Sequence, residues 1–238
     1  MNEPKTKRLV ILANSIKRNH YCVAGREILS AKGKWSPGLW TRPVDPTNEG
    51  AIALATMRFA DGGLPRFLDI VEIPILKWAN DPSHPEDWVV DASRPWRREG
   101  VFPLAQLPML VERPPMLWTS WTDPRKVRAG YVVKMPGPAT LYLIKPEGKV
   151  TAVVFREKDT KKFRQRLHLK YNGVEHEFDI TDPNFESCYL AAARKIGEEP
   201  VEIPLPNDGS LHVCLSLTPE FHGAHYKIAA TIWEAPPA

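Results

Sequence analysis

The pattern of apolar and polar positions along the chain predicts a protein built mainly of short β-strands. In the C-terminal half, six well-bounded segments have the two-residue alternation or the apolar continuity that is typical of strands. They span residues 140–144, 150–156, 163–171, 174–180, 211–217 and 226–233. In the N-terminal half, residues 8–13, 38–44 and 67–78 are expected strands, and Pro74 indicates an edge or a bulge in the third.

One helix is expected among the C-terminal strands. Asp182 is a favourable N-cap, Pro183 suits the first helical position, and apolar residues recur at positions 185, 189, 193 and 196. Gly197 then ends the predicted helix. The order of strands, one helix and two further strands is typical of a small β-barrel, of which the OB fold is a common form.

The N-terminal half has weaker helical signals. The alanine-containing segment 49–59 is expected to form one helix. Residues 81–115 are crowded with proline, tryptophan and charge, so they are expected to form long ordered loops with one short helix near residues 104–111.

The dipeptide Asn172–Gly173 lies between two alternating segments and predicts a two-residue type I′ hairpin turn. The resulting register places cations opposite carboxylates on the neighbouring strand. It pairs Tyr171 with Val174, Lys170 with Glu175, His168 with Glu177, Leu167 with Phe178, and Arg166 with Asp179. We therefore interpret this basic strand as half of a charge ladder and not as a binding surface.

Composition narrows the class of protein. The chain has 238 residues, which suggests one large domain or two small ones, and its 24 prolines disfavour a helix bundle. The three cysteines form no CxxC pair, which is typical of a reducing cytoplasm. The apolar run at residues 9–13 is too short for a signal peptide or a membrane span, so we expect a cytoplasmic protein with no membrane partner.

The net charge of +4 is distributed unevenly along the chain. Residues 1–44 contain nine cations and two anions, a net charge of +7, whereas the remaining residues contain 23 cations and 26 anions. Such an asymmetry predicts a polyanionic partner, and a solvated basic arm is the alternative.

Several short phrases occur in a fixed order along nearly the whole chain. They are Leu12-Ala13-Asn14-Ser15 with Lys17, Cys22-Val23-Ala24-Gly25, Gly33-Lys34-Trp35, Trp40-Thr41-Arg42-Pro43, Leu68-Asp69-Ile70-Val71-Glu72-Ile73-Pro74, His84-Pro85-Glu86-Asp87-Trp88, Leu117-Trp118, Leu141-Tyr142-Leu143-Ile144-Lys145, Tyr171-Asn172-Gly173, Ile180-Thr181-Asp182-Pro183, Leu215-Ser216-Leu217, and His225-Tyr226-Lys227-Ile228-Ala229-Ala230. In these phrases the chain resembles the dual OB-containing domain family of bacteria and archaea. Two segments depart from the resemblance, the alanine-rich residues 51–57 and the loop at 121–128.

The resemblance implies a mainly β protein of two tandem OB-like small β-barrels with a few short helices. We expect an N-terminal barrel with long loops rich in proline and tryptophan at residues 1–128, and a C-terminal barrel with one inserted helix at residues 129–238. The family resemblance also implies no established catalytic activity and a role in nucleic-acid recognition within prokaryotic defence systems, whose other proteins would be further partners.

Sequence motifs for catalysis are absent: there is no GxxxxGK[ST], GxGxxG, HExxH or GxSxG sequence. Three weaker groups have a chemical and a structural interpretation. His222, His225 and Cys214 suggest a metal site, the 81–87 loop with Asp81, His84, Glu86 and Asp87 suggests acid–base or Mg²⁺ chemistry, and Cys22 suggests a reactive thiol. Turn formation and core packing explain each group more simply, so we predict no catalytic residue, metal or cofactor.

The basic segment also contains tryptophans, and cations combined with aromatic platforms are the usual equipment for binding single strands. The predicted nucleic-acid-binding residues are Asn14, Ser15, Lys17, Arg18, Arg26, Lys34, Trp35, Trp40 and Arg42. The tryptophans could instead close the barrel core. Single-stranded DNA or RNA is the favoured ligand, and the alternative function is a protein-interaction scaffold or a binder of a nucleotide-like small molecule at the barrel mouth.

Overall fold

The computed structural model describes residues 5–17, 20–31, 34–119, 123–135, 137–157, 159–160, 162–185 and 199–236. The chain divides into two compact units. Unit 1 comprises Met1–Val111 with Gly137–Ala139, and unit 2 comprises Glu112–Pro136 with Thr140–Ala238. This division lies earlier in the sequence than the expected boundary at 128/129, because Leu117, Trp118 and Val127 pack in the core of unit 2.

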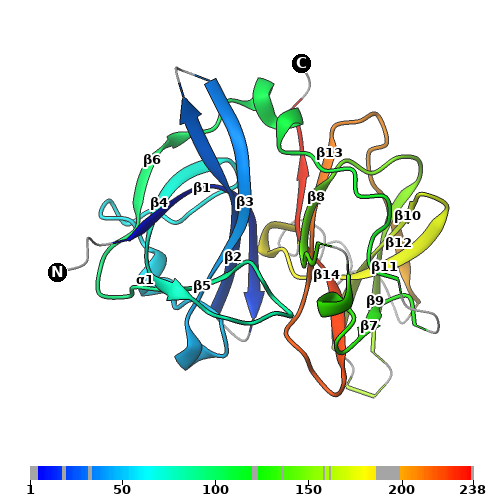
Figure 1. The fold of residues 1–238 in the computed structure, drawn as a ribbon. Coiled ribbons are helices and arrows are strands. Elements are labelled where there is room, and N and C mark those ends of the chain that lie inside the picture. Colours follow the sequence, from blue (N-terminus) through cyan, green and yellow to red (C-terminus); the bar gives the residue numbers. More distant parts are fainter. Residues whose placement is uncertain are drawn as a thin grey trace. The chain divides into compact units, whose positions relative to one another are not determined.

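Unit 1 contains a closed five-stranded barrel, drawn from blue to cyan in Figure 1. Its sheet has the order β1-β2-β3-β5-β4-β6, and an additional pairing of β1 with β4 closes the first five strands into a ring. The β3–β5 pairing is parallel and the other pairings are antiparallel. The strands are β1 (Thr6–Lys17), β2 (His20–Ala31), β3 (Lys34–Val44), β4 (Asp69–Trp78), β5 (Asp87–Val90) and β6 (Arg97–Val101).

The core of unit 1 fills the barrel with alternate residues of its strands. Leu9 and Ile11 of β1 and Val71 and Ile73 of β4 are completely buried in one cluster. Because successive side chains of a strand point to opposite faces, the intervening residues of β1 lie on the outer face of the barrel. Burial of this apolar surface is the main force that closes the barrel.

Several expectations for the N-terminal half were wrong. The predicted helix at 49–59 is reduced to the four-residue α1 (Leu54–Met57), preceded by the 3-10 turn η1 (Pro46–Asn48). Glu49 and Gly50 have positive φ values of 52° and 84°, and Ile52 forms an extended bridge with Tyr21, so the chain cannot be helical there.

The region expected to be loops, 81–115, contains two strands, β5 and β6. The strand β2 was not expected either. The short helix predicted near 104–111 is confirmed as the 3-10 helix η2 (Leu104–Met109).

Unit 2 contains the C-terminal strands in the order β12-β9-β10-β11-β14-β13-β8, and β7 also pairs with β14. The strands are β7 (Lys126–Arg128), β8 (Leu141–Ile144), β9 (Val150–Arg156), β10 (Phe163–Tyr171), β11 (Val174–Ile180), β12 (Val201–Pro204), β13 (Leu211–Leu217) and β14 (Ala224–Glu234), and one 3-10 turn is η3 (Val132–Lys134). The pattern of apolar residues therefore predicted β9, β10, β11 and β13 with correct ends, and it missed β7 and β12.

The connectivity of unit 2 repeats that of unit 1. In unit 1 the first strand pairs with the second and the fourth, and the third strand pairs in parallel with the fifth. In unit 2 two short strands, β8 and β9, take the place of the first strand. β9 pairs with β10, which corresponds to the second strand, and β8 pairs with β13, which corresponds to the fourth. The parallel pair is β11 with β14. The expectation of two tandem OB-like units, mainly β with a few short helices, is confirmed.

The predicted β10–β11 hairpin is confirmed residue by residue. All five predicted pairs are present, from Tyr171 opposite Val174 to Arg166 opposite Asp179. Asn172 and Gly173 have φ values of 46° and 84°, as a type I′ turn requires. Arg166 forms an ion pair with Asp179, which agrees with the interpretation of this face as a charge ladder.

The start of the predicted C-terminal helix is also confirmed. Pro183 begins a helical segment, and the carboxylate of Asp182 accepts hydrogen bonds from the backbone N–H groups of Asn184 (2.8 Å) and Phe185 (3.4 Å). The same carboxylate accepts a 2.8 Å bond from the N–H of Ile232 in β14. The rest of the predicted helix, to Gly197, lies outside the described residues.

Among the described residues, no helix is long and apolar enough to cross a membrane.

The close approach of β1 and β2 gives a test of the barrel. A Cβ atom on Gly25 would lie 2.2 Å from the backbone oxygen of Val10, which cannot move without disturbing the sheet. We expect Gly25→Ala to lower the free energy of unfolding by about 3 kcal/mol or more, measured by urea denaturation. Gly62→Ala is the control, because Gly62 has a φ of 85° but open space around it, and should cost only about 1 kcal/mol. Equal effects of the two variants would contradict the close packing.

Candidate nucleic-acid interface

The outer face of β1, β2 and β3 brings together four residues of the basic segment. Arg26 lies opposite Val10 of β1 and Trp40 of β3, so these side chains share the face on which Arg8 also lies. The guanidinium of Arg8 lies 5.1 Å from the ring centroid of Trp35, and that of Arg26 lies 6.0 Å from the ring of Trp40. The face therefore carries two arginine–tryptophan pairs within cation–π range.

The two tryptophans differ in their availability to a ligand. Trp40 is only 8% exposed, so it is buried on this face and offers no free stacking face. Trp35 is half-buried, and its ring lies edge-on to Phe102, with 6.3 Å between centroids. Trp35 is the predicted aromatic residue that retains exposed surface.

Arg26 is held in place by the backbone of the neighbouring strand. Its Nε and Nη2 atoms donate to the carbonyl oxygen of Gly38 at 2.9 and 2.6 Å. The β2–β3 register shifts between Arg26 and Ile28, which places a bulge at this position. The bulge turns Leu39 outward, where its side chain is 79% exposed.

Arg42 has a structural role. Its Nε and Nη2 atoms donate to the two carboxylate oxygens of Asp87 at 2.7 and 2.9 Å, and both residues are buried. Burial opposes the charged form of Arg42, but the Asp87 carboxylate outweighs this effect and raises its pKa further above the ordinary range. A guanidinium engaged in this way is not available to a phosphate, so Arg42 is not part of the candidate interface.

Asn14 and Ser15 are also engaged within the protein. The Nδ2 of Asn14 donates to the carbonyl of Pro65 at 3.2 Å, and the buried hydroxyl of Ser15 donates to the carbonyl of Cys22 at 3.5 Å. These contacts favour a structural role for both residues.

The remaining predicted cations lie at the ends of β2. Lys17 ends β1 and Lys34 begins β3, while their side chains, and the whole of Arg18, lie outside the described residues. The twelve residues of β2 separate the two ends by about 36 Å. The predicted cations therefore do not form a single patch: Lys17 and Arg18 lie near the start of β2 in the sequence, and Lys34 lies near its end.

Carboxylates from inside and outside the basic segment neutralise part of its charge. Lys7 forms an ion pair with Glu27, which also accepts a 3.1 Å hydrogen bond from Thr41, and Arg8 forms an ion pair with Glu99. The charge count over residues 1–44 includes Glu27 but not Glu99, which lies far along the sequence.

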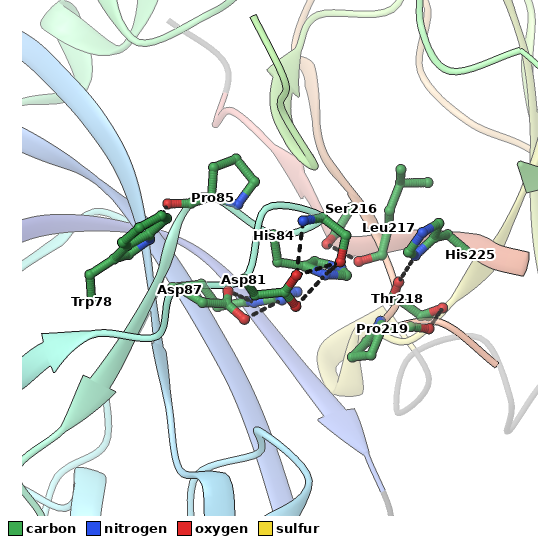
Figure 2. Close-up of polar contacts among 12 residues, drawn as sticks. Trp78, Asp81, His84, Pro85, Asp87, Ser216, Leu217, Thr218, Pro219 and His225 are labelled. Carbon is green, nitrogen blue, oxygen red and sulfur yellow. Dashed lines mark hydrogen bonds and ion pairs between the residues drawn. The ribbon is translucent and has the colours of Figure 1, made fainter. Parts of the chain in front are cut away.

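The polar 81–87 loop is organised as a turn, as Figure 2 shows. The Asp81 carboxylate accepts hydrogen bonds from the backbone N–H (2.8 Å) and the hydroxyl (2.6 Å) of Ser83, and lies 3.4 Å from His84. Burial opposes ionisation of Asp81, but the bonds from Ser83 outweigh it and lower its pKa. Across the same loop, the indole of Trp78 donates to the carbonyl of Pro85 at 3.0 Å. These contacts favour the structural interpretation of the loop.

The proposed metal group is not assembled. His225 is buried, with its Nδ1 2.9 Å from the carbonyl of Thr218, whereas His222 is exposed. Across the part of the chain that the structure describes, no group of three or more metal-ligating side chains is brought together.

The strand order and a comparison with known protein families both indicate OB-like units. The model of the dual OB-containing domain family matches residues 7–232, nearly the whole length. The chain belongs to the dual OB-containing domain family. A comparison with curated proteins gave no match. The two compact units of this dual OB protein agree with the dual OB architecture in the family description.

Sequence reasoning missed one group of exposed aromatic side chains in unit 2. Phe221 and His222 lie at the turn between β13 and β14, beside Tyr226 and the strand β7. The sequence does contain a glycine-containing turn flanked by aromatic residues at this place. It was missed because it lies far along the chain from the basic segment.

Unit 2 also buries an unusual pair of titratable groups. The Nζ of Lys227 lies 3.2 Å from the Nδ1 of His176, and both residues are almost completely buried. Burial, with a smaller effect of Lys227, lowers the pKa of His176 to about 4. Burial also lowers the pKa of Lys227 to about 8, against the opposing effects of Asp123 and Glu177. At neutral pH, His176 is therefore an uncharged acceptor for the lysine.

The Arg42–Asp87 pair gives the first test of these assignments. We expect Arg42→Ala to lower the free energy of unfolding by about 3–5 kcal/mol, because it leaves a buried carboxylate unpaired. The double variant Arg42→Met/Asp87→Met should recover most of that loss. Both are measured by urea denaturation. A loss below about 1 kcal/mol in the single variant would contradict a structural role.

The buried histidine predicts a dependence of stability on pH. As pH falls from about 6.5 to 4, the unfolded chain binds a proton at His176 that the folded protein does not, so folding stability decreases. The loss should reach up to about 3 kcal/mol. His176→Phe should reduce the decrease over this range, measured by urea denaturation at several pH values. Parallel curves for the two proteins would contradict it.

Proposed function

We propose that this dual OB protein is a nucleic-acid-binding module without catalytic activity of its own, and that single-stranded DNA or RNA is its favoured ligand. The observation that carries the proposal is the ring β1-β2-β3-β5-β4-β1 in unit 1. In OB barrels the face of the second and third strands and the loops after the first and fourth strands bind oligonucleotides.

The chemistry at these three places supports the proposal. The β2–β3 face carries Arg26 and the partly exposed Trp35. Lys17 ends β1, and Arg18 follows it in the sequence at the β1–β2 connection. The end of β4, which leads into the 81–87 loop, exposes Lys77 and Trp78, and the Trp78 side chain is 41% exposed. Cations next to aromatic rings suit a polymer of phosphates and bases.

The setting of this activity is part of the proposal. A binding module without chemistry would act as the recognition component of a prokaryotic defence system, together with other proteins that supply the effector. We also propose a cytoplasmic location, which the buried free thiol of Cys214 supports.

Leu39 favours a second candidate function, a protein-interaction scaffold. Its side chain is 79% exposed at the β2–β3 bulge, so an apolar partner surface that covers it would remove apolar area from water. The two functions are distinguished by the material that co-purifies with the protein. Absorbance at 260 nm favours nucleic acid, and a stoichiometric protein that is lost in Leu39→Ser favours the scaffold.

The salt dependence of binding tests the main proposal. Fluorescence anisotropy with labelled single-stranded DNA, single-stranded RNA and duplex should show binding whose log–log salt slope is about −0.7 per phosphate contact with single strands. Lys17→Ala/Arg18→Ala should weaken binding and make the slope shallower by about one unit or more. Arg164→Ala is the control, because Arg164 is ion-paired with Glu157 in unit 2.

Two outcomes would overturn the proposal. One is the absence of binding to all three polymers at low salt. The other is binding whose affinity and salt slope change equally in Arg164→Ala and in Lys17→Ala/Arg18→Ala, because the cations of the β1–β2 connection would then have no specific role.

A further inference from the structure

The connection between β13 and β14 is a tight hairpin with a fixed geometry. Phe221 and Ala224 form a backbone bridge, with N···O distances of 2.8 and 3.3 Å in the two directions. The two central residues, His222 and Gly223, have φ values of 50° and 76°, as a type I′ turn requires. A positive φ is unfavourable for histidine, and such strain is retained where the surrounding structure imposes it.

The strand β7 braces this turn from the side. The backbone N–H of Ala129 donates to the carbonyl of Gly223 at 2.9 Å. β7 pairs with the start of β14, so that Arg128 lies opposite Ala224 and Lys126 opposite Tyr226. The tip is therefore held by three segments of chain and is preorganised.

Three aromatic rings meet at this tip. The ring of Phe221 lies 4.1 Å from that of His222 and 6.4 Å from that of Tyr226, with interplanar angles of 64° and 53°. The Phe221 side chain is 55% exposed, more than the 41% of Trp78. An apolar ring held in water at the end of a rigid turn leaves unfavourable apolar surface uncovered, which a planar ligand would cover.

Cations accompany these rings. The Lys126 amine lies 5.2 Å from the ring centroid of Tyr226, and Arg128 is exposed on the strand beside the turn. Carboxylates share the neighbourhood: Asp123 lies 3.4 Å from Lys126 and also pairs with Arg125, Glu177 and Asp179 act electrostatically on Arg125, and Glu220 is exposed. The cations beside the rings are therefore Lys126 and Arg128.

We propose that the exposed ring of Phe221, which His222 and Tyr226 support at angles of 64° and 53°, is a stacking platform for an unpaired nucleobase, with Lys126 and Arg128 beside it for the adjacent phosphate. This inference rests on the proposed function, and it adds to the interface on unit 1 a site on unit 2 with a stated ligand class. Every base has a π face, so the platform accepts any sequence. The bases of a duplex are stacked on each other, so the platform favours single strands.

The test uses the full chain and single-stranded oligonucleotides that contain the fluorescent base 2-aminopurine. We expect Phe221→Ala to weaken binding about 5- to 150-fold, the range that corresponds to the loss of one stacked base. Quenching of 2-aminopurine by the protein should decrease in the same variant. Phe221→Trp should retain affinity and quenching, whereas Phe221→Leu, which keeps apolar area without a π face, should lose both. Val174→Ala is the control, because Val174 is 44% exposed near the other type I′ turn of unit 2.

The outcomes separate the two proposals. If the unaltered protein binds single strands and Phe221→Ala leaves both affinity and quenching unchanged, the platform is refuted and the proposed function stands. Equal weakening in Phe221→Leu and Phe221→Trp would refute stacking in the same way. If the unaltered protein binds no nucleic acid at low salt, the proposed function fails and the platform with it. A urea denaturation curve of each variant confirms that it is folded.

Discussion

The pairing of β3 with β5 is short, and the barrel of unit 1 depends on it. Only three residue pairs join these parallel strands, beginning with Arg42 opposite Asp87. The backbone N–H of Arg42 also donates to the carbonyl of Glu86 at 2.8 Å. The bidentate ion pair adds two charge-assisted bonds at the same position, where the surroundings are buried and an unpaired charge would be costly. The contact between Arg42 and Asp87 therefore sets the register of β3 and β5, closes the barrel, and pairs two buried charges.

That contact also changes the meaning of the basic N-terminal segment. A count along the sequence treats each cation as available, but Lys7, Arg8 and Arg42 all have carboxylate partners in the folded protein. Two of these partners, Glu99 and Asp87, belong to strands that sequence reasoning assigned to loops. The error in secondary structure thus led to the error in the site, because missing a strand also means missing the anions that it carries.

Local signals predicted the fold well, and non-local ones did not. The Asn172–Gly173 turn and the Asp182 cap are determined by neighbouring residues, and the structure confirms both. By contrast, β5 has four residues and gains its stability from β3 and β4, which no local pattern reveals. The exposed tip at Phe221 was missed for a related reason: its basic residues come from β7 and its aromatic residues from the β13–β14 turn and β14, about a hundred residues further along the sequence.

The strand β14 has a consequence for how unit 2 is made. It pairs with β7, β11 and β13, and its residue Ile232 donates to the Asp182 cap of the helix. Since a ribosome releases the chain from its N-terminus, the β9–β10–β11 meander can form while β14 is still unsynthesised. Until then β11 and β13 have open edges that could pair with another chain. Unit 2 is thus most exposed to aggregation before β14 is synthesised, whereas the five barrel strands of unit 1 are already complete by residue 90.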